Sequence, residues 1–287
     1  MGKSNRDTIG VNDCQILAHY KYEADQYILT LSSKEIAEAT QPGQFVHLSV
    51  SGILAMRRPI SVMSVDKENG TFDLLYKIVG EGTRQLADRK IGDMLSVIGP
   101  IGNGFQMTDK KIPLLIGGGV GMPPIIAIAQ NIKDNDYFSP YVILGSEVPF
   151  PFDTVSSNLG GFYSSKIHTM PLLEEWGVQA GLTSLQSFDG VYEGYVTGLA
   201  KEYLDSLSEA DLLNVEIFTC GPHPMLEAVS KLAKDYNLPC QVSLEEYMAC
   251  AVGGCAGCVV EVQTENGPAM KRVCVDGPVF EAQTVFQ

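Results

Sequence analysis

The sequence predicts a multidomain fold: an antiparallel β-barrel, then an α/β unit with a doubly wound sheet, then a small cysteine-rich unit. Three observations support this prediction. About one hundred residues at the start alternate short apolar runs with turns, as the strands of a small barrel do. A continuous apolar run, Ile112 to Ile116, then enters a glycine-rich turn. Four cysteines follow near the C-terminal end. We expect the three units at residues 8–108, 109–236 and 237–287.

The first unit is expected to be built from strands, with one short helix at Thr83 to Arg89. The regular spacing of the strands favours an antiparallel barrel over an open sheet. The expected strands are Asp13 to Tyr20, Gln26 to Leu31, Gln44 to Val50, Pro59 to Asp66, Thr71 to Ile78 and Met94 to Ile98.

The second unit has the strand, turn and helix order that is typical of nucleotide-binding sheets. The run Ile112 to Ile116 is apolar throughout, as in a strand buried on both faces of a parallel sheet. The turn Gly117 to Gly121 leads into a helix, Met122 to Asn131, with two prolines in its first turn. The remaining expected elements are buried strands at Tyr141 to Leu144 and Val215 to Thr219, an edge or connecting piece at Tyr195–Val196, an irregular surface loop at Pro149 to Ser165, and a helix with Met225, Val229, Leu232 and Tyr236 on one face.

Composition limits the class of protein. The 287 residues are 45% hydrophobic and 19% charged, which is typical of globular proteins with two or three units of this size. A formal net charge of −14 argues against a nucleic-acid partner, which needs a basic face. No stretch is long and apolar enough for a membrane span. The opening residues 1–6 carry charge without an apolar run after them, so we expect no signal peptide and a cytoplasmic protein.

The cysteines near the C-terminus have the spacing C-x4-C-x2-C with a distal fourth, which is the plant-type pattern for a [2Fe–2S] cluster. Between them lie only small residues, 251–254 and 256–257 apart from one valine, which let backbone N–H groups turn toward sulfur. A structural zinc site is the alternative, but zinc usually takes two similar cysteine knuckles. Cys14 and Cys240 are interpreted as ordinary thiols. The predicted ligands are Cys250, Cys255, Cys258 and Cys274.

Two motifs of the barrel suit the pyrophosphate of a dinucleotide. The run Arg58 to Ser61 places a permanent cation and a hydroxyl near a strand start, and Gly80 to Thr83 precedes a helix whose N–H groups can hold phosphate. Each has a simpler interpretation, because an Arg-Pro pair is often a surface turn and Gly-x-Gly-Thr is often only a helix cap. The turn Gly117 to Gly121 likewise serves either a nucleotide or close helix–strand packing.

The run Cys220-Gly221-Pro222 follows a buried strand, where ligands meet the carboxyl ends of parallel strands. Cys220 is either part of that site or a buried thiol only. The nucleotide is expected to be NAD and not NADP, because no arginine occurs between Arg89 and Arg272 to bind a 2′-phosphate. Glu147, in the turn after a buried strand, can instead accept the ribose hydroxyls.

These motifs occur in the order of the ferredoxin–NADP reductase superfamily. The segment from Ser243 to Phe280, which contains the cysteines, more narrowly resembles the electron-transfer subunit of class 1B dihydroorotate dehydrogenase. The resemblance covers nearly the whole chain. It implies an FAD-binding barrel, an NAD-binding α/β domain and a [2Fe–2S] domain that faces a separate FMN-containing catalytic subunit, in a hetero-oligomer of pyrimidine biosynthesis.

The same resemblance implies roles for individual residues. For FAD, Arg58 would meet the pyrophosphate, Ser61 would lie by the flavin ring, and Gly82 and Thr83 would cap the phosphates. We expect Arg57 to be a solvent-facing charge and not a second phosphate contact. The expected FAD residues are Arg58, Pro59, Ile60, Ser61, Tyr76, Ile78, Gly82 and Thr83, and the expected NAD residues are Gly118, Gly119 and Gly121, with Cys220 and Gly221 near the nicotinamide.

The expected function is conversion between paired and single electrons, because a flavin exchanges two electrons with a nicotinamide and single electrons with an iron–sulfur cluster. Electrons would pass from dihydroorotate through the partner's FMN, the cluster and FAD to NAD⁺. We find no acid–base pair here that suits oxidation of dihydroorotate. Two alternatives remain open: a small subunit of another NAD(P)H:ferredoxin or sulfide oxidoreductase complex, and a degenerate reductase that binds zinc and acts as a scaffold.

Overall fold

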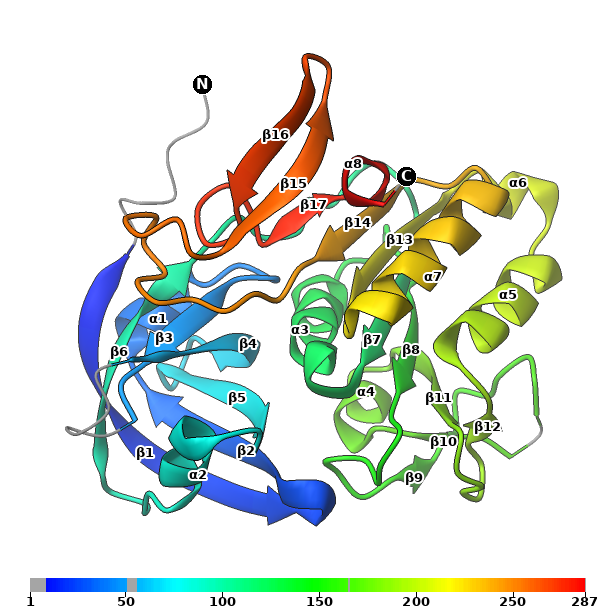
Figure 1. Cartoon of the computed structure of the whole chain (residues 1–287). Coiled ribbons are helices and arrows are strands. Elements are labelled where there is room, and N and C mark those ends of the chain that lie inside the picture. Colours follow the sequence, from blue (N-terminus) through cyan, green and yellow to red (C-terminus); the bar gives the residue numbers. More distant parts are fainter. Residues whose placement is uncertain (1–8, 51–55, 165, 287) are drawn as a thin grey trace.

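A computed structural model describes residues 9–50, 56–164 and 166–286 (Figure 1). The opening residues 1–6 and Ser165, on which two of the expectations fall, lie outside the described residues. The first six strands close into an antiparallel barrel in the order β1-β2-β5-β4-β3-β6, which confirms the predicted barrel. The strands are β1 (Gly10–Tyr22), β2 (Gln26–Ser32), β3 (Phe45–Leu48), β4 (Arg58–Asp66), β5 (Thr71–Lys77) and β6 (Met94–Ile101), with a short 3₁₀ turn, η2 (Glu23–Asp25), between the first two.

The barrel forms because alternate residues of its strands point inward and fill it. Leu29 and Leu31 of β2 and Leu74 of β5 are fully buried in this interior. Leu75, one residue further along β5, packs instead against the α/β part of the chain. One face of the barrel wall is therefore covered by the second unit.

The expectation of a single barrel helix, Thr83 to Arg89, is wrong in number and bounds. Two helices are present, α1 (Lys34–Ala39) and α2 (Glu81–Ala87). The Ser33 hydroxyl accepts the Ile36 N–H at 3.3 Å and caps α1, which is too short to show a helical period in the sequence. α2 begins two residues early because the Thr83 hydroxyl satisfies the N–H groups that precede the helix.

The second unit is a seven-stranded sheet in the order β12-β11-β8-β7-β13-β14-β17. Neighbouring strands are parallel except β14 and β17. The three predicted buried strands are confirmed, whereas β11 and β14 were not predicted. The strands are β7 (Ile112–Gly118), β8 (Tyr141–Gly145), β11 (Gln179–Ser184), β12 (Tyr192–Glu193), β13 (Val215–Cys220), β14 (Cys240–Ser243) and β17 (Val279–Glu281).

Helices cover both faces of this sheet (Figure 1), which explains the continuous apolar strands. Along β7, Leu114 and Ile116 face a core shared with α5 and α7, and Leu115 faces the core shared with α3 and α4. The expected edge piece at Tyr195–Val196 is wrong, because Tyr195 is the N-cap and Val196 the first residue of α5. The helices are α3 (Met122–Ile132), α4 (Pro171–Glu175), α5 (Val196–Ser206), α6 (Glu209–Leu212) and α7 (His223–Asp235), with the 3₁₀ turn η3 (Gly119–Gly121) before α3.

The segment from Pro149 to Ser165 is not simply a surface loop. Phe150 and Phe152 are buried, and their rings stack with centroids 5.3 Å apart. They join the core under α3 and α4. A short strand, β9 (Val155–Ser156), pairs with β10 (His168–Thr169). Phe150 and Phe152 of this segment therefore pack the interior, which its Ser and Gly content did not indicate, whereas Phe162 is exposed.

The C-terminal segment is joined to the sheet at both ends, through β14 and β17. Between them it forms an antiparallel ribbon of β15 (Val259–Thr264) and β16 (Gly267–Arg272), and it ends in α8 (Ala282–Val285). Asn103, after β6, ties this segment to the barrel: its side chain donates to the carbonyls of Val275 and Asp276 at 3.0 and 3.1 Å. The cysteine segment is thus held between barrel and sheet.

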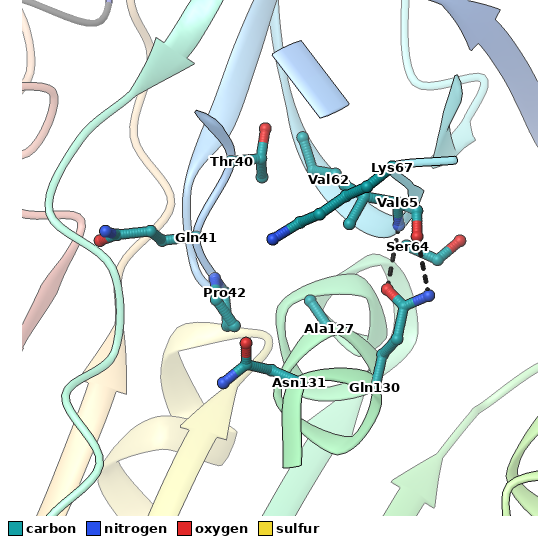
Figure 2. A pocket seen from close by; sticks show the side chains of 10 residues that line it. All are labelled: Thr40, Gln41, Pro42, Val62, Ser64, Val65, Lys67, Ala127, Gln130 and Asn131. Carbon is teal, nitrogen blue, oxygen red and sulfur yellow. Dashed lines mark hydrogen bonds between the residues drawn. The ribbon is translucent and has the colours of Figure 1, made fainter. Parts of the chain in front are cut away.

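Helix α3 fastens the sheet to the barrel from the other side. The Gln130 side chain pairs with the Val65 backbone, accepting its N–H at 3.0 Å and donating to its carbonyl at 2.9 Å (Figure 2). Beside this pair lies a cavity of about 250 Å³, across which Lys67 extends. None of the helices in the described ranges is long and apolar enough to cross a membrane.

Candidate cofactor sites

The two predicted pyrophosphate motifs of the barrel are in contact. The guanidinium of Arg58 lies over Gly82, so closely that a Cβ at Gly82 would stand 2.0 Å from Arg58 Nε. Arg58 Nη1 donates to the carbonyls of Met56 and Arg57, the latter at 3.3 Å. A cation therefore sits at the start of α2, where a phosphate would also meet free backbone N–H groups. Only glycine at position 82 leaves room for it.

Thr83 acts as a helix cap in this structure. Its hydroxyl accepts the N–H groups of Val79 at 3.0 Å and Gly80 at 3.3 Å, and it donates to the Gly80 carbonyl at 3.1 Å. The simpler interpretation of the Gly-x-Gly-Thr motif therefore applies to Thr83, whereas Gly82 meets the cation. The turn is preorganised by its own hydrogen bonds before any phosphate is present.

The remaining predicted FAD residues divide between two faces of the barrel wall. Ser61 pairs with Phe45 and Pro59 with His47 across β3 and β4, so these side chains share the outer face. Ile60, between them, is buried in the barrel interior. A role for Ile60 is thus to hold the motif in place and not to touch a ligand on the outer face.

Tyr76 is 3% exposed and belongs to the barrel core. Its ring stacks on Tyr27 with centroids 5.2 Å apart, and its hydroxyl is 2.8 Å from His19 Nε2. Ile78 is half-buried at the end of the same stretch, and its N–H donates to the Asp25 carbonyl at 3.0 Å. Of the two, Ile78 has the accessible side chain.

Arg57 does not face solvent as a free charge, so that expectation is wrong. Its Nη1 donates to the Ser96 carbonyl at 2.6 Å and its Nη2 to the Ser96 hydroxyl at 2.9 Å. A third, longer bond of 3.3 Å reaches the His47 carbonyl. Arg57 therefore joins β3 to β6 at the edge of the predicted flavin face.

The glycine turn and the Cys220–Gly221 pair come together at the switch point of the sheet. The chain leaves β7 toward β8 on one side and β13 lies on the other, and ligands bind where the strand order reverses. A Cβ at Gly121 would stand 2.5 Å from Cα of Gly221. Gly119 has a φ of 55°, which favours glycine. These residues therefore lie together at this edge of the sheet, and their contact with NAD stays a prediction.

Close packing accounts for other glycines of this turn. A Cβ at Gly117 would stand 3.0 Å from Cα of Met122, at the start of α3. At Gly118 it would stand 2.4 Å from the sulfur of Met225, which also covers Gly221. Met225 was predicted only as a residue of the helix face, and its contact with both glycines emerges from the tertiary structure alone.

Cys220 is fully buried at the end of β13. Burial and then the nearby Glu245 raise its pKa well above the usual value, so the side chain is a neutral thiol. Glu245 lines a cavity of about 400 Å³ between the start of α7 and the cysteine segment. Solvent reaches its carboxyl group, yet protein surrounds it on most sides, and this desolvation raises its pKa. Sequence reasoning did not single out Glu245, which could have been found as an acid just beyond a parallel strand.

Glu147 lies exposed after β8, at the carboxyl edge of the sheet. Its carbonyl accepts the Gln186 side-chain N–H at 2.7 Å, which joins the ends of β8 and β11. Because the contact is to the backbone, the carboxylate of Glu147 stays available. The predicted acceptor for ribose hydroxyls thus lies at the carboxyl edge of the sheet, where ligands bind to sheets of this type, and its role stays a prediction.

The cysteine segment turns through residues with left-handed backbone. Ala251, Gly253 and Ala256 have φ values of 55°, 83° and 52°. The turns aim N–H groups at sulfur: the Cys255 N–H donates to Cys250 Sγ, and the Gly257 N–H to Cys255 Sγ, each at 3.4 Å. Small residues therefore allow the backbone to approach the thiols, as predicted.

The four thiols form two adjacent pairs. Cys258 and Cys274 are buried with sulfurs 3.3 Å apart, whereas Cys250 and Cys255 lie nearer the surface. Burial and then the contact with Cys258 raise the pKa of Cys274 to about 12. For Cys250 desolvation acts in the same direction, but backbone N–H groups of its loop outweigh it and lower the pKa to about 7.

Within the described ranges, no three His, Cys, Asp or Glu side chains are close enough together to form a metal site. The two cysteine pairs are nevertheless near neighbours, because the charge of Cys250 contributes to the raised pKa of Cys274. Four thiols, with N–H groups directed at them, fit an iron–sulfur cluster in their chemistry.

Comparison with known proteins identifies the family. Residues 14–105 match the oxidoreductase FAD-binding domain, and residues 245–286 match the iron-sulfur cluster binding domain of dihydroorotate dehydrogenase B. Over 273 residues, 95% of this chain and 97% of its relative, the chain is 33% identical to a protein of Caldanaerobacter subterraneus subsp. tengcongensis named dihydroorotate dehydrogenase B (NAD(+)), electron transfer subunit. The chain belongs to the family of dihydroorotate dehydrogenase B electron transfer subunits. Proteins of the same name from Bacillus cereus and Bacillus anthracis are 34% identical over 88% of this chain and 90% of theirs.

Solved structures share the fold of this chain. A chain from an NADH-dependent reduced ferredoxin–NADP oxidoreductase, described for flavin-based electron bifurcation, has a TM-score of 0.78 at 25% identity and covers 96% of this chain and 90% of its own. The ferredoxin reductase of carbazole 1,9a-dioxygenase, with a TM-score of 0.63 at 19% identity over 80% of this chain and 67% of its own, shares the fold. The chain thus contains an FAD-binding domain and an iron–sulfur cluster binding domain.

Proposed function

We propose that the chain carries electrons from the FMN of a dihydroorotate dehydrogenase catalytic subunit, through a [2Fe–2S] cluster and FAD, to NAD⁺ in pyrimidine biosynthesis. The observation that carries the proposal is the position of the cysteine segment. It leaves β14 at the switch-point edge of the sheet and runs to the outer face of the barrel before returning to β15 (Figure 1). The residues predicted for the three cofactors therefore lie around one segment, which supports the proposal.

The residues that would hold each group follow from these contacts. Arg58, beside Gly82, would bind the FAD pyrophosphate, and Ser61 would lie by the flavin ring on the outer face of β4. Gly121 and Gly221 would border the nicotinamide nucleotide. When bound, a flavin exchanges a hydride with nicotinamide and single electrons with a cluster. The neutral Cys220 thiol and the Glu245 carboxyl group, at the end of the same strands, would shape the nicotinamide pocket and can hold a proton there.

The proposal also includes a cytoplasmic hetero-oligomer with an FMN-containing partner. The relatives are named electron transfer subunits, which implies a catalytic subunit that this chain complements. We assign oxidation of dihydroorotate to that partner. The exposed Tyr247, 94% accessible just before the first cysteine, marks the side from which the partner would approach.

The division of labour can be tested with the purified chain, alone and with the partner. We expect NADH-dependent reduction of a dye by the chain alone, and dihydroorotate-dependent formation of NADH only when the FMN subunit is added. A Cys274→Ser variant should keep the dye reaction and lose the coupled one, because the buried cluster ligand is removed. Orotate formation by the chain alone would refute the assignment.

A second function is favoured by the likeness to the bifurcating oxidoreductase chain. In that case the partner would be a larger flavoprotein with its own clusters, and co-purification would distinguish the two.

The zinc-binding scaffold makes a different prediction, since a protein with FAD and an iron–sulfur cluster absorbs visible light and one with zinc alone does not. Colourless protein with stoichiometric zinc after anaerobic purification would support the scaffold.

A further inference from the structure

His47 lies on the outer face of the barrel between the flavin motif and the cysteine segment. It stands opposite Pro59 in the β3–β4 pair, and opposite residues share a face. Phe45, two residues earlier and therefore on the same face, packs in a core with Met248 and Ala251 of the cysteine segment. His47 is thus one strand away from the flavin motif and lies beneath the segment that leads to the first cysteine.

The imidazole of His47 is buried without a hydrogen-bond partner. It is 1% exposed, and neither ring nitrogen makes a hydrogen bond within the described ranges. Burial and then the positive charge of Arg57 lower its pKa to about 4, so the ring is neutral and has one N–H to donate. Buried polar groups are nearly always hydrogen-bonded, so this ring requires an explanation.

Two backbone carbonyls are placed to become that partner, those of Arg57 and Met248. Each raises the pKa of His47, as a carbonyl that accepts from the ring N–H does, although the present geometry falls short of a hydrogen bond. Met248 precedes Cys250 by two residues. A hydrogen bond to Met248 therefore reaches the segment that carries the first predicted ligand, whereas one to Arg57 stays within the barrel wall, where Arg57 is bound to Ser96.

We propose that His47 is a positioning residue: in the cofactor-loaded protein its ring N–H donates to the Met248 carbonyl and holds the cysteine segment against the flavin face of the barrel. This hydrogen bond fixes the cluster loop relative to the flavin motif, on which single-electron transfer between the two groups depends. The inference rests on the proposed function. The competing explanation is that His47 only fills space beneath the segment.

Two substitutions separate a donor from a filler. His47→Leu keeps an apolar body of similar size and removes the N–H, whereas His47→Gln keeps an amide donor. The matched control is His168→Leu, because His168 lies on the β9–β10 ribbon with its ring nitrogens near the hydroxyls of Thr154 and Ser156. Each full-length protein is purified with FAD and iron quantified. The cluster is examined by EPR after reduction, and its reduction by NADH is followed by stopped flow.

We expect His47→Leu to retain FAD and reduction of FAD by NADH, but to slow the transfer from flavin to cluster about 10-fold or more and to change the EPR spectrum of the reduced cluster. His47→Gln should restore both, and His168→Leu should change neither. A wild-type rate and spectrum in His47→Leu would overturn the inference, as would equal losses in the Leu and Gln variants. If His47→Leu does not fold, impaired transfer in a correctly loaded His47→Gln overturns it. Absence of FAD or a cluster in the wild-type chain would instead refute the proposed function.

Discussion

Replacing Gly82 by alanine is expected to weaken FAD binding about 10- to 150-fold without destabilising the chain. The added Cβ would lie 2.0 Å from Arg58 Nε and 2.3 Å from its Nη2, so the guanidinium has to move away. Those atoms end a flexible side chain, and alanine is the better helix former by about 1 kcal/mol, so folding loses little. A charge-assisted hydrogen bond from arginine to phosphate contributes about 1.5–3 kcal/mol, which sets the expected loss of affinity.

The assay is titration of FAD into the apoprotein, followed by flavin fluorescence, with thermal unfolding measured in parallel. Gly80→Ala is the matched control, because Gly80 lies in the same turn with an extended φ of −174° and nothing within 4 Å of an added Cβ. It should bind FAD like the wild type. Wild-type affinity in Gly82→Ala would refute the assignment of Arg58 to the pyrophosphate, and a loss in both variants would show that the turn itself is responsible.

Three further predictions concern the other sites. Gly121→Ala should raise KM for NADH at least about tenfold while FAD content is unchanged, because its Cβ meets the Gly221 backbone at 2.5 Å and the strand ends must separate; an unchanged KM would contradict this. Glu147→Lys should shift the ratio of kcat/KM for NADH over NADPH by about tenfold toward NADPH, and no shift would remove Glu147 from the ribose site. In the cluster-free chain, alkylation of Cys250, followed by mass spectrometry of the labelled peptides, should rise with pH through about 7, since its thiolate forms there; a rise centred on the usual thiol pKa of about 9 would show that the backbone N–H groups have no effect. Cys14, which is buried and whose pKa burial raises to about 12, should stay unmodified.

Sequence reasoning found those elements whose burial shows as a pattern of apolar residues within one continuous stretch of the sequence. The strand Ile112 to Ile116 is apolar at every position because helices cover both faces of the sheet. β11, with the sequence Gln179-Ala-Gly-Leu-Thr-Ser184, has no such run, and its buried Thr183 and Ser184 are accommodated by its place between β8 and β12. Helix α1 was missed for a related reason, because it is too short to show a hydrophobic period in the sequence.

The sites divide in the same way. The cysteine spacing, the Arg58 to Ser61 run and the glycine turn were readable because each is a local pattern that a ligand requires. The roles of Arg57 and Glu245 were not, because each depends on a neighbour distant in sequence: Ser96 for the first, and Cys220 for the second. Thr83 is an intermediate case. The Gly-x-Gly-Thr pattern was recognised in the sequence, but in the structure Thr83 acts as a helix cap.

The sequence by itself determined the barrel, the doubly wound sheet and the family, and it proposed the cysteine ligands, because hydrophobic period and ligand spacing are properties of a short stretch. The tertiary structure decided what these parts do to one another. It placed the Arg58 guanidinium over Gly82, brought Gly121 against Gly221, and buried His47 under the segment that leads to Cys250. Such contacts join residues that are far apart in the chain, and only the packing of barrel, sheet and cysteine segment against one another determines which of them meet.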